Sequence, residues 1–398
     1  MEHIAIVGAG QAGATLVETL RKEGYQNRLT LWGEEPYLPY QRPPLSKAYL
    51  LGDMARERLY LRPEGFYADQ GVDLRLSTKV IAIDPAARTL THGGGTEAWD
   101  TLILATGSTP RRLPATLGGD LPGVFAVRTL ADIDGMEPAF QDGAHLLVVG
   151  GGYIGLEAAA VARKRGMRVT VLEAEERLLA RVSCPETADW FAALHRSQGV
   201  DIRLGARLAR LTGQDRVTGA ELADGTRLDV DAVVCGIGIL PNTDLAEAAG
   251  LTLDNGIAVD ALGQTSAPDI WAAGDCCSFP HGDGRVRLES VPHAIDQAQA
   301  VARNVLGQDT PYGAKPWFWS DQYDVKLQIA GLNTGYDRVV VRQGDGRSHW
   351  YYAGQRLLAV DAMNDPRAYM VGKRLIEAGR SPAPASVADA EVALKSLL

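Results

Sequence analysis

The sequence predicts an α/β protein in which one strand–turn–helix–strand unit occurs twice, followed by a smaller α+β domain. Three observations lead to this prediction. Short apolar runs at residues 4–7 and 146–149 each end in a glycine-rich loop. Each loop precedes apolar residues at helical spacing and then a second strand-like run. From residue 316 the composition becomes aromatic and strand-like, and a chain of 398 residues has room for two or three domains.

Composition and charge exclude several classes of protein. Hydrophobic residues at 46% and charged residues at 22% are typical of a globular protein, and a net charge of −9 disfavours nucleic acid as the main partner. The apolar stretch 146–162 contains four glycines and Glu157, so it is not a membrane span. No signal segment precedes the first strand-like run. We therefore expect a soluble, cytoplasmic protein without a membrane segment.

The first unit begins with the strand at residues 4–7 and the loop at residues 8–13. Apolar residues at 14, 16, 17 and 20 predict a helix, and residues 29–31 a second strand. The unit closes with a strand at residues 101–104 that runs into Ala105-Thr106-Gly107.

The second unit repeats this order. The strand 146–149 runs into Gly150-Gly151-Gly152-Tyr153-Ile154-Gly155, and a helix and the strand 169–172 follow. A strand ending at Gly236 closes the unit. Two such units predict two Rossmann-like nucleotide-binding domains that arose by duplication.

The remaining chain differs from both units. An apolar run at residues 269–273 precedes Gly274-Asp275, and a helix is expected at about residues 294–305. The aromatic segment from residue 316 predicts a third domain, which ends in a Pro/Ala linker (381–386) and a terminal helix (387–397).

The two glycine loops have the pattern G-x-G-x-x-G, in which each glycine has its own function. One permits the tight turn, one lets the backbone approach a pyrophosphate, and one lets the helix pack on the strand. The following helix N-terminus supplies free N–H groups to the phosphates. A single loop of this kind can be purely structural, but two in the same context predict dinucleotide binding.

Acidic residues follow the second strand of each unit, where a carboxylate can hydrogen-bond a ribose hydroxyl. Glu34 is the candidate in the first unit, with Glu35 beside it, and Glu173 is the candidate in the second. A carboxylate repels the 2′-phosphate of NADPH, so Glu173 predicts a preference for NADH. Arg177 and Arg181 lie nearby in sequence and could weaken that preference.

Six segments together resemble the bacterial FAD-dependent, NADH-using ferredoxin reductases, in particular the putidaredoxin reductase branch and the reductase components of aromatic-ring dioxygenases. They are residues 39–47, 105–111, 150–157, 236–242, 273–276 and 317–323, and the resemblance runs from Ile4 to about Ile376. It implies a glutathione-reductase-like fold. The implied domains are an FAD-binding domain (1–110 and 238–315), an NADH-binding domain (111–237) and a C-terminal domain (316–398).

The resemblance also implies which residues contact the cofactors. For FAD they are Gly8, Gly10, Ala12, Gly13, Glu34, Arg42, Lys47, Val80, Ala105, Gly107, Arg128, Gly274, Asp275 and Val291. For NADH they are Gly150, Gly152, Ile154, Gly155, Glu173 and Gly238.

Four catalytic residues are implied beside the flavin. Lys47 and Glu157 would form an ion pair next to flavin N5, Tyr153 would cover the flavin until nicotinamide displaces it, and Trp319 would cover it from the C-terminal domain. Hydride transfer needs no side-chain acid or base, because the cofactors carry the chemistry. Each residue also has an ordinary interpretation: a surface lysine, a first-turn glutamate and two core aromatics.

Cysteine placement separates this chain from the disulfide reductases and peroxidases of the same fold. Those proteins carry a redox cysteine near the first helix after the nucleotide loop, whereas residues 43–48 contain none. Cys276 and Cys277 are adjacent and are expected to be buried packing residues, and Cys184 and Cys235 complete the set without C-x-x-C spacing. No metal site is expected, and without a cysteine His293 has no redox role.

The resemblance implies that electrons pass from NADH through FAD, one at a time, to a separate 2Fe-2S ferredoxin serving a cytochrome P-450 or a ring-hydroxylating oxygenase. No iron–sulfur ligand set is present in this chain, so the cluster must be on the partner. A locally basic docking face would suit an acidic ferredoxin, with Arg303, Lys315, Arg338 and Arg342 as candidates and a solvated face as the alternative. Rubredoxin, oxygen or quinone as acceptor, or a non-catalytic NADH-binding flavoprotein, are the competing interpretations.

Overall fold

Five parallel strands form the sheet around which the first part of the chain folds. In the computed structural model, which describes residues 1–398, their order is β19-β7-β1-β2-β3. Their bounds are β1 His3–Val7, β2 Arg28–Trp32, β3 Val72–Arg75, β7 Thr101–Leu104 and β19 Ile270–Ala272. The strands inside this sheet are nearly continuous buried apolar runs, whereas the edge strand β3 carries Asp73 and Arg75.

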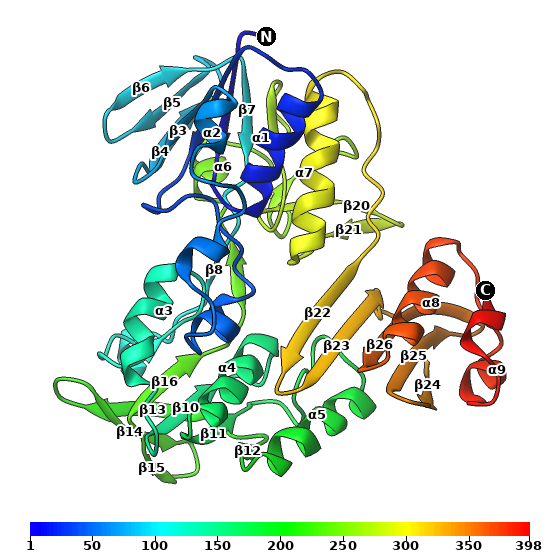
Figure 1. Cartoon of the computed structure of the whole chain (residues 1–398). Helices are drawn as coiled ribbons and strands as arrows, with labels where there is room; N and C mark the ends of the chain where they lie inside the picture. Colours follow the sequence, from blue (N-terminus) through cyan, green and yellow to red (C-terminus); the bar gives the residue numbers. More distant parts are fainter. The chain divides into compact units, whose positions relative to one another are not determined.

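Helices α1 (Gln11–Lys22) and α7 (Val291–Val305) lie side by side against this sheet, one blue and one yellow in Figure 1. Leu16 and Leu20 of α1 and Ala298 and Val301 of α7 are fully buried in their shared core. The helix expected at residues 294–305 is therefore present and begins three residues earlier, where Ser290 caps it.

The chain divides into two compact units. The first unit comprises Met1–Gln41, Arg56–Thr109 and Leu240–Pro316, and the second comprises Arg42–Ala55, Pro110–Ile239 and Trp317–Leu398. The remaining elements of the first unit are the 3-10 turn Arg56–Leu59, α2 Phe66–Asp69, β4 Val80–Asp84, β5 Thr89–His92, β6 Gly95–Ala98, α6 Asp244–Ala248, β18 Ile257–Ala258, β20 Cys277–His281 and β21 Gly284–Val286. The chain passes between the units after Gln41, Ala55, Thr109, Ile239 and Pro316, and the third and fourth of these crossings lie in β8 (Ser108–Pro110) and β17 (Ile239–Pro241).

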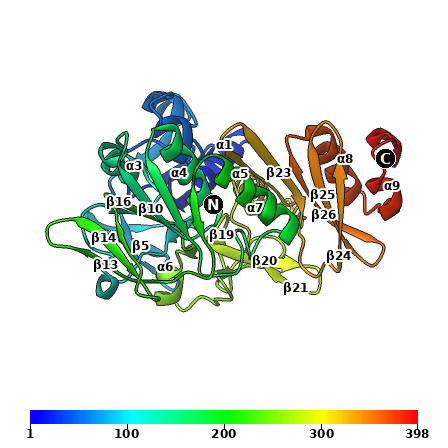
Figure 2. The same ribbon diagram turned by 90° about the horizontal axis from the view of Figure 1, so that it is seen from below.

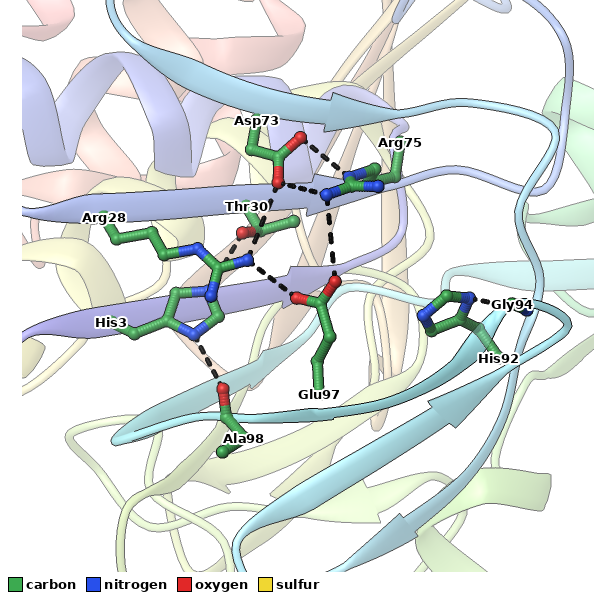
Figure 3. A network of polar contacts seen from close by, with 9 residues as sticks. All are labelled: His3, Arg28, Thr30, Asp73, Arg75, His92, Gly94, Glu97 and Ala98. Atoms are coloured by element: carbon green, nitrogen blue, oxygen red, sulfur yellow. Dashed lines mark hydrogen bonds and ion pairs between the residues drawn. The ribbon is translucent and has the colours of Figure 1, made fainter.

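A network of charged side chains joins the antiparallel β4–β5–β6 meander to the parallel sheet of the first unit (Figure 3). Arg28 on β2 contacts Glu97 on β6 at 2.9 Å, and Arg75 on β3 contacts Asp73 at 2.7 Å and Glu97 at 3.8 Å. Nδ1 of His3 on β1 hydrogen-bonds the Ala98 carbonyl of β6, and burial lowers the pKa of His3. The pairs are partly exposed, so each adds little stability, and together they orient the meander.

The second unit contains a matching five-stranded parallel sheet in the order β12-β11-β10-β16-β9. Its strands are β9 Val124–Phe125, β10 His145–Val149, β11 Arg168–Leu172, β12 Asp201–Arg203 and β16 Ala232–Cys235. Helix α4 (Tyr153–Lys164) follows β10 as α1 follows β1. The predicted duplication is therefore present in the fold.

The other elements around this sheet are the π-helical turn Leu45–Tyr49, the 3-10 turn Ala115–Leu117, α3 Leu130–Met136, the 3-10 turn Glu137–Ala139, α5 Pro185–Ser197, β13 Leu208–Gly213, β14 Val217–Leu222 and β15 Arg227–Asp229. Strands β13–β15 form a small antiparallel sheet. Residues 42–55 cluster with the second unit because the π-helical turn packs on α4. The three-domain boundaries derived from the sequence stay a prediction.

The C-terminal part of the second unit is an antiparallel sheet in the order β22-β23-β26-β25-β24. Its strands are β22 Trp317–Gln322, β23 Val325–Gly331, β24 Arg338–Gln343, β25 Arg347–Ala353 and β26 Arg356–Met363. Helix α8 (Pro366–Glu377) packs on β26 and β23 (Figure 2).

The predicted terminal helix at residues 387–397 is wrong. The segment contains α9 (Pro384–Ala388) and a 3-10 turn (Leu394–Leu397), with irregular backbone between them. The buried guanidinium of Arg342 donates hydrogen bonds of 2.7–3.1 Å to four carbonyls of this segment, those of Val387, Asp389, Ala390 and Val392. Carbonyls bound to a side chain in this way are not available for a helical ladder.

None of the helices combines the length and the apolar composition that crossing a lipid bilayer requires.

Candidate functional site: two glycine loops and a buried ion pair

The glycine loop between β1 and α1 contains three glycines with different surroundings. A Cβ on Gly8 would lie 2.0 Å from the Ala105 carbonyl oxygen, and one on Gly13 would lie 2.0 Å from that of Gly8. Gly8 also has a φ of +120°. At Gly10 no atom lies within 4 Å of the position a Cβ would take. Packing therefore requires Gly8 and Gly13, whereas the backbone at Gly10 is open to a ligand.

Residues from much later in the chain lie against this loop. A Cβ on Gly274 would be 3.2 Å from the Cβ of Ala12, so the Gly274–Asp275 turn packs on the start of α1. Asp275 accepts a hydrogen bond of 2.9 Å from Ser108, the residue after Gly107. The structure thus gathers Gly8, Gly10, Ala12, Gly13, Ala105, Gly107, Gly274 and Asp275 at one edge of the sheet.

Three further predicted FAD residues belong to the same unit. Glu34 follows β2, is exposed, and pairs with Lys79 at 3.1 Å. Val80 is buried at the start of β4, and Val291 opens α7. Glu35, the neighbour of Glu34, accepts a hydrogen bond of 2.5 Å from Tyr40. Of the two acids, Glu34 has the more accessible carboxylate.

The second loop, between β10 and α4, repeats the geometry of the first. A Cβ on Gly150 would lie 2.5 Å from the Gly236 carbonyl oxygen, and one on Gly155 would lie 2.2 Å from that of Gly150. At Gly152 the nearest atom would be 3.8 Å away. The middle glycine is again the one open to a ligand.

Neither helix that follows these loops has a side-chain cap. The N-cap residues of α1 and α4 are Gly10 and Gly152, whereas Thr129, Ser290 and Asp365 cap α3, α7 and α8 through their side chains. The first N–H groups of α1 and α4 therefore remain free for phosphate oxygens. This arrangement fits two dinucleotides, one at each loop.

Glu173 comes directly after β11 with its carboxylate fixed by the backbone. Its two oxygens accept hydrogen bonds from Gly151 N–H at 2.8 Å and Glu175 N–H at 3.0 Å. Arg177 donates its hydrogen bonds to the carbonyls of Ala180 and Ser183 and forms no ion pair with Glu173. A fixed negative charge beside the loop disfavours a second phosphate on the ribose.

Two other predicted NADH residues flank this loop. Ile154 is exposed in the first turn of α4. Gly238 has a φ of +99°, its carbonyl accepts a hydrogen bond from Arg111 N–H, and Arg181 lies close to it. Arg181, unlike Arg177, thus lies beside a predicted nicotinamide contact.

Lys47 and Glu157 form the predicted ion pair, with 2.8 Å between Nζ and Oε2. Lys47 belongs to the π-helical turn Leu45–Tyr49 and has non-helical backbone angles (φ −131°, ψ −109°). Glu157 belongs to α4, and only 2% of it is exposed. π-Helical turns are rare and occur frequently at functional sites.

Two serines that the sequence analysis missed complete the coordination of Glu157. Ser46 donates to Oε2 at 2.9 Å and Ser320 donates to Oε1 at 2.7 Å. Ser46 adjoins Lys47 and could have been found from the sequence. Ser320 lies 163 positions from Glu157 and only the fold brings it there.

The two candidate aromatic covers, Tyr153 and Trp319, both contact aromatic side chains of β22 in the second unit. The Tyr153 ring packs on Phe318 with centroids 4.9 Å apart, and Trp319 stacks on Trp317 at 5.5 Å. The Tyr153 hydroxyl is buried without a hydrogen-bond partner, and burial raises its pKa well above the ordinary value. A buried hydroxyl without a partner costs free energy, so the position of this ring is not stabilised by its hydroxyl.

Arg42 and Arg128, the last predicted FAD residues, lie together in the second unit. Arg42 donates a hydrogen bond of 2.6 Å to the Arg128 carbonyl. The Arg128 N–H in turn donates to Asp132 at 3.1 Å, at the start of α3.

The cysteines and His293 lie among packed core residues. Cys276 and Cys277 are fully buried, and their thiols contact the carbonyls of Ala273 and Gly274. Burial raises the pKa of both thiols. His293 stacks on Phe279. No group of three or more His, Cys, Asp or Glu side chains is arranged to hold a metal ion.

Two of the four basic residues suggested for partner docking have internal partners. Arg342 is buried and anchors the C-terminal segment, so its assignment to a docking surface is wrong. Arg303 pairs with Glu23 at 2.9 Å.

Comparison with known proteins agrees with this geometry. Residues 2–298 match the family model described as pyridine nucleotide-disulphide oxidoreductase, and residues 317–398 match the one described as reductase C-terminal. The ferredoxin reductase subunit of 5,5′-dehydrodivanillate O-demethylase from a Sphingobium species is 43% identical, covering 98% of this chain and 97% of that protein. Putidaredoxin reductase of Pseudomonas putida is 41% identical over 100% of this chain and 97% of its own length.

The fold of this chain is also similar to that of a solved reductase structure. The reductase in the covalent putidaredoxin reductase–putidaredoxin complex superposes with a TM-score of 0.96 at 40% identity, covering 100% of this chain and 98% of that one. The resemblance and the fold class derived from the sequence are thereby confirmed. Its two glycine loops lie within the matched residues 2–298, and the chain belongs to the pyridine nucleotide-disulphide oxidoreductase family.

Proposed function

We propose that this protein is an NADH-dependent ferredoxin reductase that delivers single electrons to a separate 2Fe-2S ferredoxin, which serves a cytochrome P-450 or another oxygenase. The cofactors are FAD and a nicotinamide dinucleotide, as in the family. The observation that carries the proposal is the Lys47–Glu157 pair, held by two serines, in a chain whose relatives are ferredoxin reductases over their full length.

When bound, FAD would supply the redox chemistry that links NADH, a two-electron donor, to a one-electron acceptor. In balance, one NADH and two oxidised ferredoxins give NAD⁺, one proton and two reduced ferredoxins. The protein binds pyrophosphates at the open backbone of Gly10 and Gly152 and keeps opposite charges at Lys47 and Glu157. Because segment 43–48 has no cysteine, electrons are not diverted to a thiol on this chain.

Glu173 supports NADH as the donor. Its carboxylate is fixed by two backbone N–H groups, and the guanidinium of Arg177 is bound to carbonyls. A 2′-phosphate at this position would meet an uncompensated negative charge.

Rapid mixing of the purified flavoprotein with NADH and, separately, NADPH tests the proposal. We expect fast bleaching of the flavin by NADH and much slower bleaching by NADPH. Addition of putidaredoxin or a dioxygenase 2Fe-2S ferredoxin should then reoxidise the flavin far faster than oxygen does. Faster reoxidation by rubredoxin, quinone or oxygen than by either ferredoxin would contradict the assigned acceptor.

The predicted cytoplasmic location is part of this proposal, because NADH is generated there. Fractionation of cells that express the chain, followed by NADH-dependent ferredoxin reduction in each fraction, would test it.

A further inference from the structure

Strand β22 presents two different faces to the rest of the second unit. Because side chains alternate along a strand, Trp317, Trp319 and Asp321 share one face and Phe318, Ser320 and Gln322 share the other. Ser320 and Gln322 are both fully buried. A strand that buries two polar side chains must give each of them hydrogen-bond partners.

Those partners form one continuous chain from the Glu157 carboxylate to α5. Ser320 Oγ lies 2.7 Å from Glu157 Oε1, and Gln322 Nε2 lies 3.2 Å from Ser320 Oγ. Gln322 Oε1 lies 2.7 Å from Nε2 of His195, whose Nδ1 lies 3.1 Å from the Tyr323 hydroxyl. His195 is also fully buried.

The carboxylate fixes the direction of every bond in this chain. Glu157 can only accept, so the single Ser320 proton points to it and Ser320 must accept from the Gln322 amide nitrogen. The Gln322 oxygen therefore faces His195, which carries its proton on Nε2 and accepts from Tyr323 on Nδ1. All the donors point toward the negative charge.

We propose that Ser320, Gln322 and His195 are positioning residues for the Glu157–Lys47 pair, through a hydrogen-bond chain that holds the carboxylate in place. This inference deepens the proposed function, because it links the C-terminal sheet to the ion pair that we place beside the flavin. A buried ion pair is favourable only when the remaining lone pairs of its carboxylate are also satisfied. Ser46 and Ser320 meet that requirement, and Gln322 and His195 keep Ser320 oriented.

The chain positions the carboxylate and does not conduct protons. An amide such as Gln322 donates and accepts at separate atoms, so a proton arriving at its oxygen does not leave readily from its nitrogen. The charged and titratable groups that face the hydrogen-bond chain are Lys47 and Glu157 at one end, His195 in the middle, and Tyr323 with the neighbouring Arg163 and Lys164 at the other. Burial lowers the pKa of His195, which keeps it neutral and leaves Glu157 as the one anion of the chain.

The test compares Ser320→Ala, Ser320→Thr and Gln322→Met with the matched control Asp321→Asn. Asp321 lies on the same strand but pairs with Lys326 outside the chain. For each holoenzyme the rate of flavin reduction by NADH is measured from pH 6 to 8.5. The flavin midpoint potential is measured by dithionite titration, and the thermal unfolding midpoint is recorded.

We expect the flavin of Ser320→Ala to be reduced about tenfold more slowly than that of the parent across this pH range, since the Glu157 carboxylate has lost one donor and is no longer held against Lys47. Ser320→Thr keeps the hydroxyl and should restore the parent profile. Gln322→Met should show a smaller loss of rate, and the midpoint potential should shift in both Ser320→Ala and Gln322→Met. Asp321→Asn should match the parent throughout.

A lower unfolding midpoint in Ser320→Ala and Gln322→Met, with an unchanged rate of flavin reduction and an unchanged potential, would overturn the inference and leave a purely structural chain. If Ser320→Ala does not retain FAD, Gln322→Met and His195→Phe give the same readouts from further along the chain. None of the three measurements uses ferredoxin, and the measurement of the flavin midpoint potential does not require NADH. The inference and the proposed function can therefore fail separately.

Discussion

At the scale of single residues, the Lys47–Glu157 pair has two unequally exposed members. The side chain of Lys47 is 19% exposed and that of Glu157 is 3% exposed. The lysine ammonium also contacts the Pro43 carbonyl at 3.3 Å. Removal of Lys47 therefore leaves a carboxylate that is almost fully buried, whereas removal of Glu157 leaves an ammonium group that is partly exposed to water.

We predict that Lys47→Met destabilises the protein more than Glu157→Gln does. The first change leaves a buried carboxylate without its cation and should lower the free energy of unfolding by about 3 kcal/mol, whereas the second leaves an ammonium that water can reach and should cost about 1 kcal/mol. Urea unfolding of the FAD-saturated proteins measures both, and the double variant should cost less than Lys47→Met alone. A larger loss in Glu157→Gln would contradict this assignment of the buried charge.

The cofactor preference depends on Glu173. We predict that Glu173→Ala lowers kcat/KM for NADH about tenfold and leaves that for NADPH unchanged or higher, because both the ribose acceptor and the repulsive charge are lost. Steady-state kinetics with both nucleotides measure the ratio. Glu175→Ala is the matched control, since Glu175 contacts Glu173 only through its backbone N–H. An unchanged ratio in Glu173→Ala would show that specificity lies elsewhere.

At the scale of structural elements, glycines of one loop have separable roles. Gly152 has ordinary backbone angles (φ −82°, ψ 176°), and the space beside it is open. A Cβ on Gly155 would lie 2.2 Å from the Gly150 carbonyl oxygen and 3.0 Å from Val148. One glycine is required by the ligand and the other by helix–strand packing.

We predict that Gly152→Ala folds normally and binds NADH about tenfold more weakly, because the methyl group occupies the approach of the pyrophosphate. Gly155→Ala should lose roughly 3 kcal/mol or more of stability, since the methyl group would overlap a carbonyl oxygen of the loop. Thermal unfolding and the KM for NADH distinguish the two variants. A strongly destabilised Gly152→Ala would show that the middle glycine also has a structural role.

At the scale of the whole molecule, buried titratable groups link stability to pH. Burial lowers the pKa of His293 and of His349 to about 4 and raises that of Asp361 to about 6. Thr187 donates a hydrogen bond of 2.7 Å to Asp361 and accepts one of 2.7 Å from Nδ1 of His349. The histidines are therefore neutral in the folded protein at neutral pH, and Asp361 titrates just below it.

These groups act in opposite directions. In the unfolded chain the two histidines have a pKa of about 6.5 and bind protons at pH values at which the buried, folded histidines do not. Their contribution to stability is therefore complete above pH 6.5 and is lost as the pH falls toward 4. Folded Asp361 holds a proton that the unfolded chain releases, so its contribution is complete below about pH 4 and is lost as the pH rises through 6.

We predict that the free energy of unfolding falls as the pH is lowered from 6.5 to 5, because two histidines outweigh one aspartate. His349→Gln should make this dependence shallower, and Asp361→Asn should make it steeper while raising stability at pH 7. Urea midpoints at several pH values measure the slope. A shallower slope in Asp361→Asn would reverse the sign assigned to that carboxyl.

Local patterns in the sequence predicted much of this architecture. The glycine loops, the helices after them and the acids after the second strands were all readable, because each depends on the backbone geometry of a few consecutive residues. The prediction of a terminal helix was wrong because Arg342, some fifty residues earlier, hydrogen-bonds the carbonyls that a helix would need. The strand-like composition of the segment that forms β22 was visible, but the partners of its buried face were not.

The sequence by itself determined the duplicated nucleotide-binding units, the absence of a cysteine beside Lys47 and, through its resemblance, the Lys47–Glu157 pair. Only the tertiary structure decided how that pair is held. Ser320, Gln322 and His195 come from a strand and a helix far from Glu157 in the chain. The physical reason is that a buried polar group must find its partner wherever packing brings a complementary atom, and no local pattern encodes that meeting.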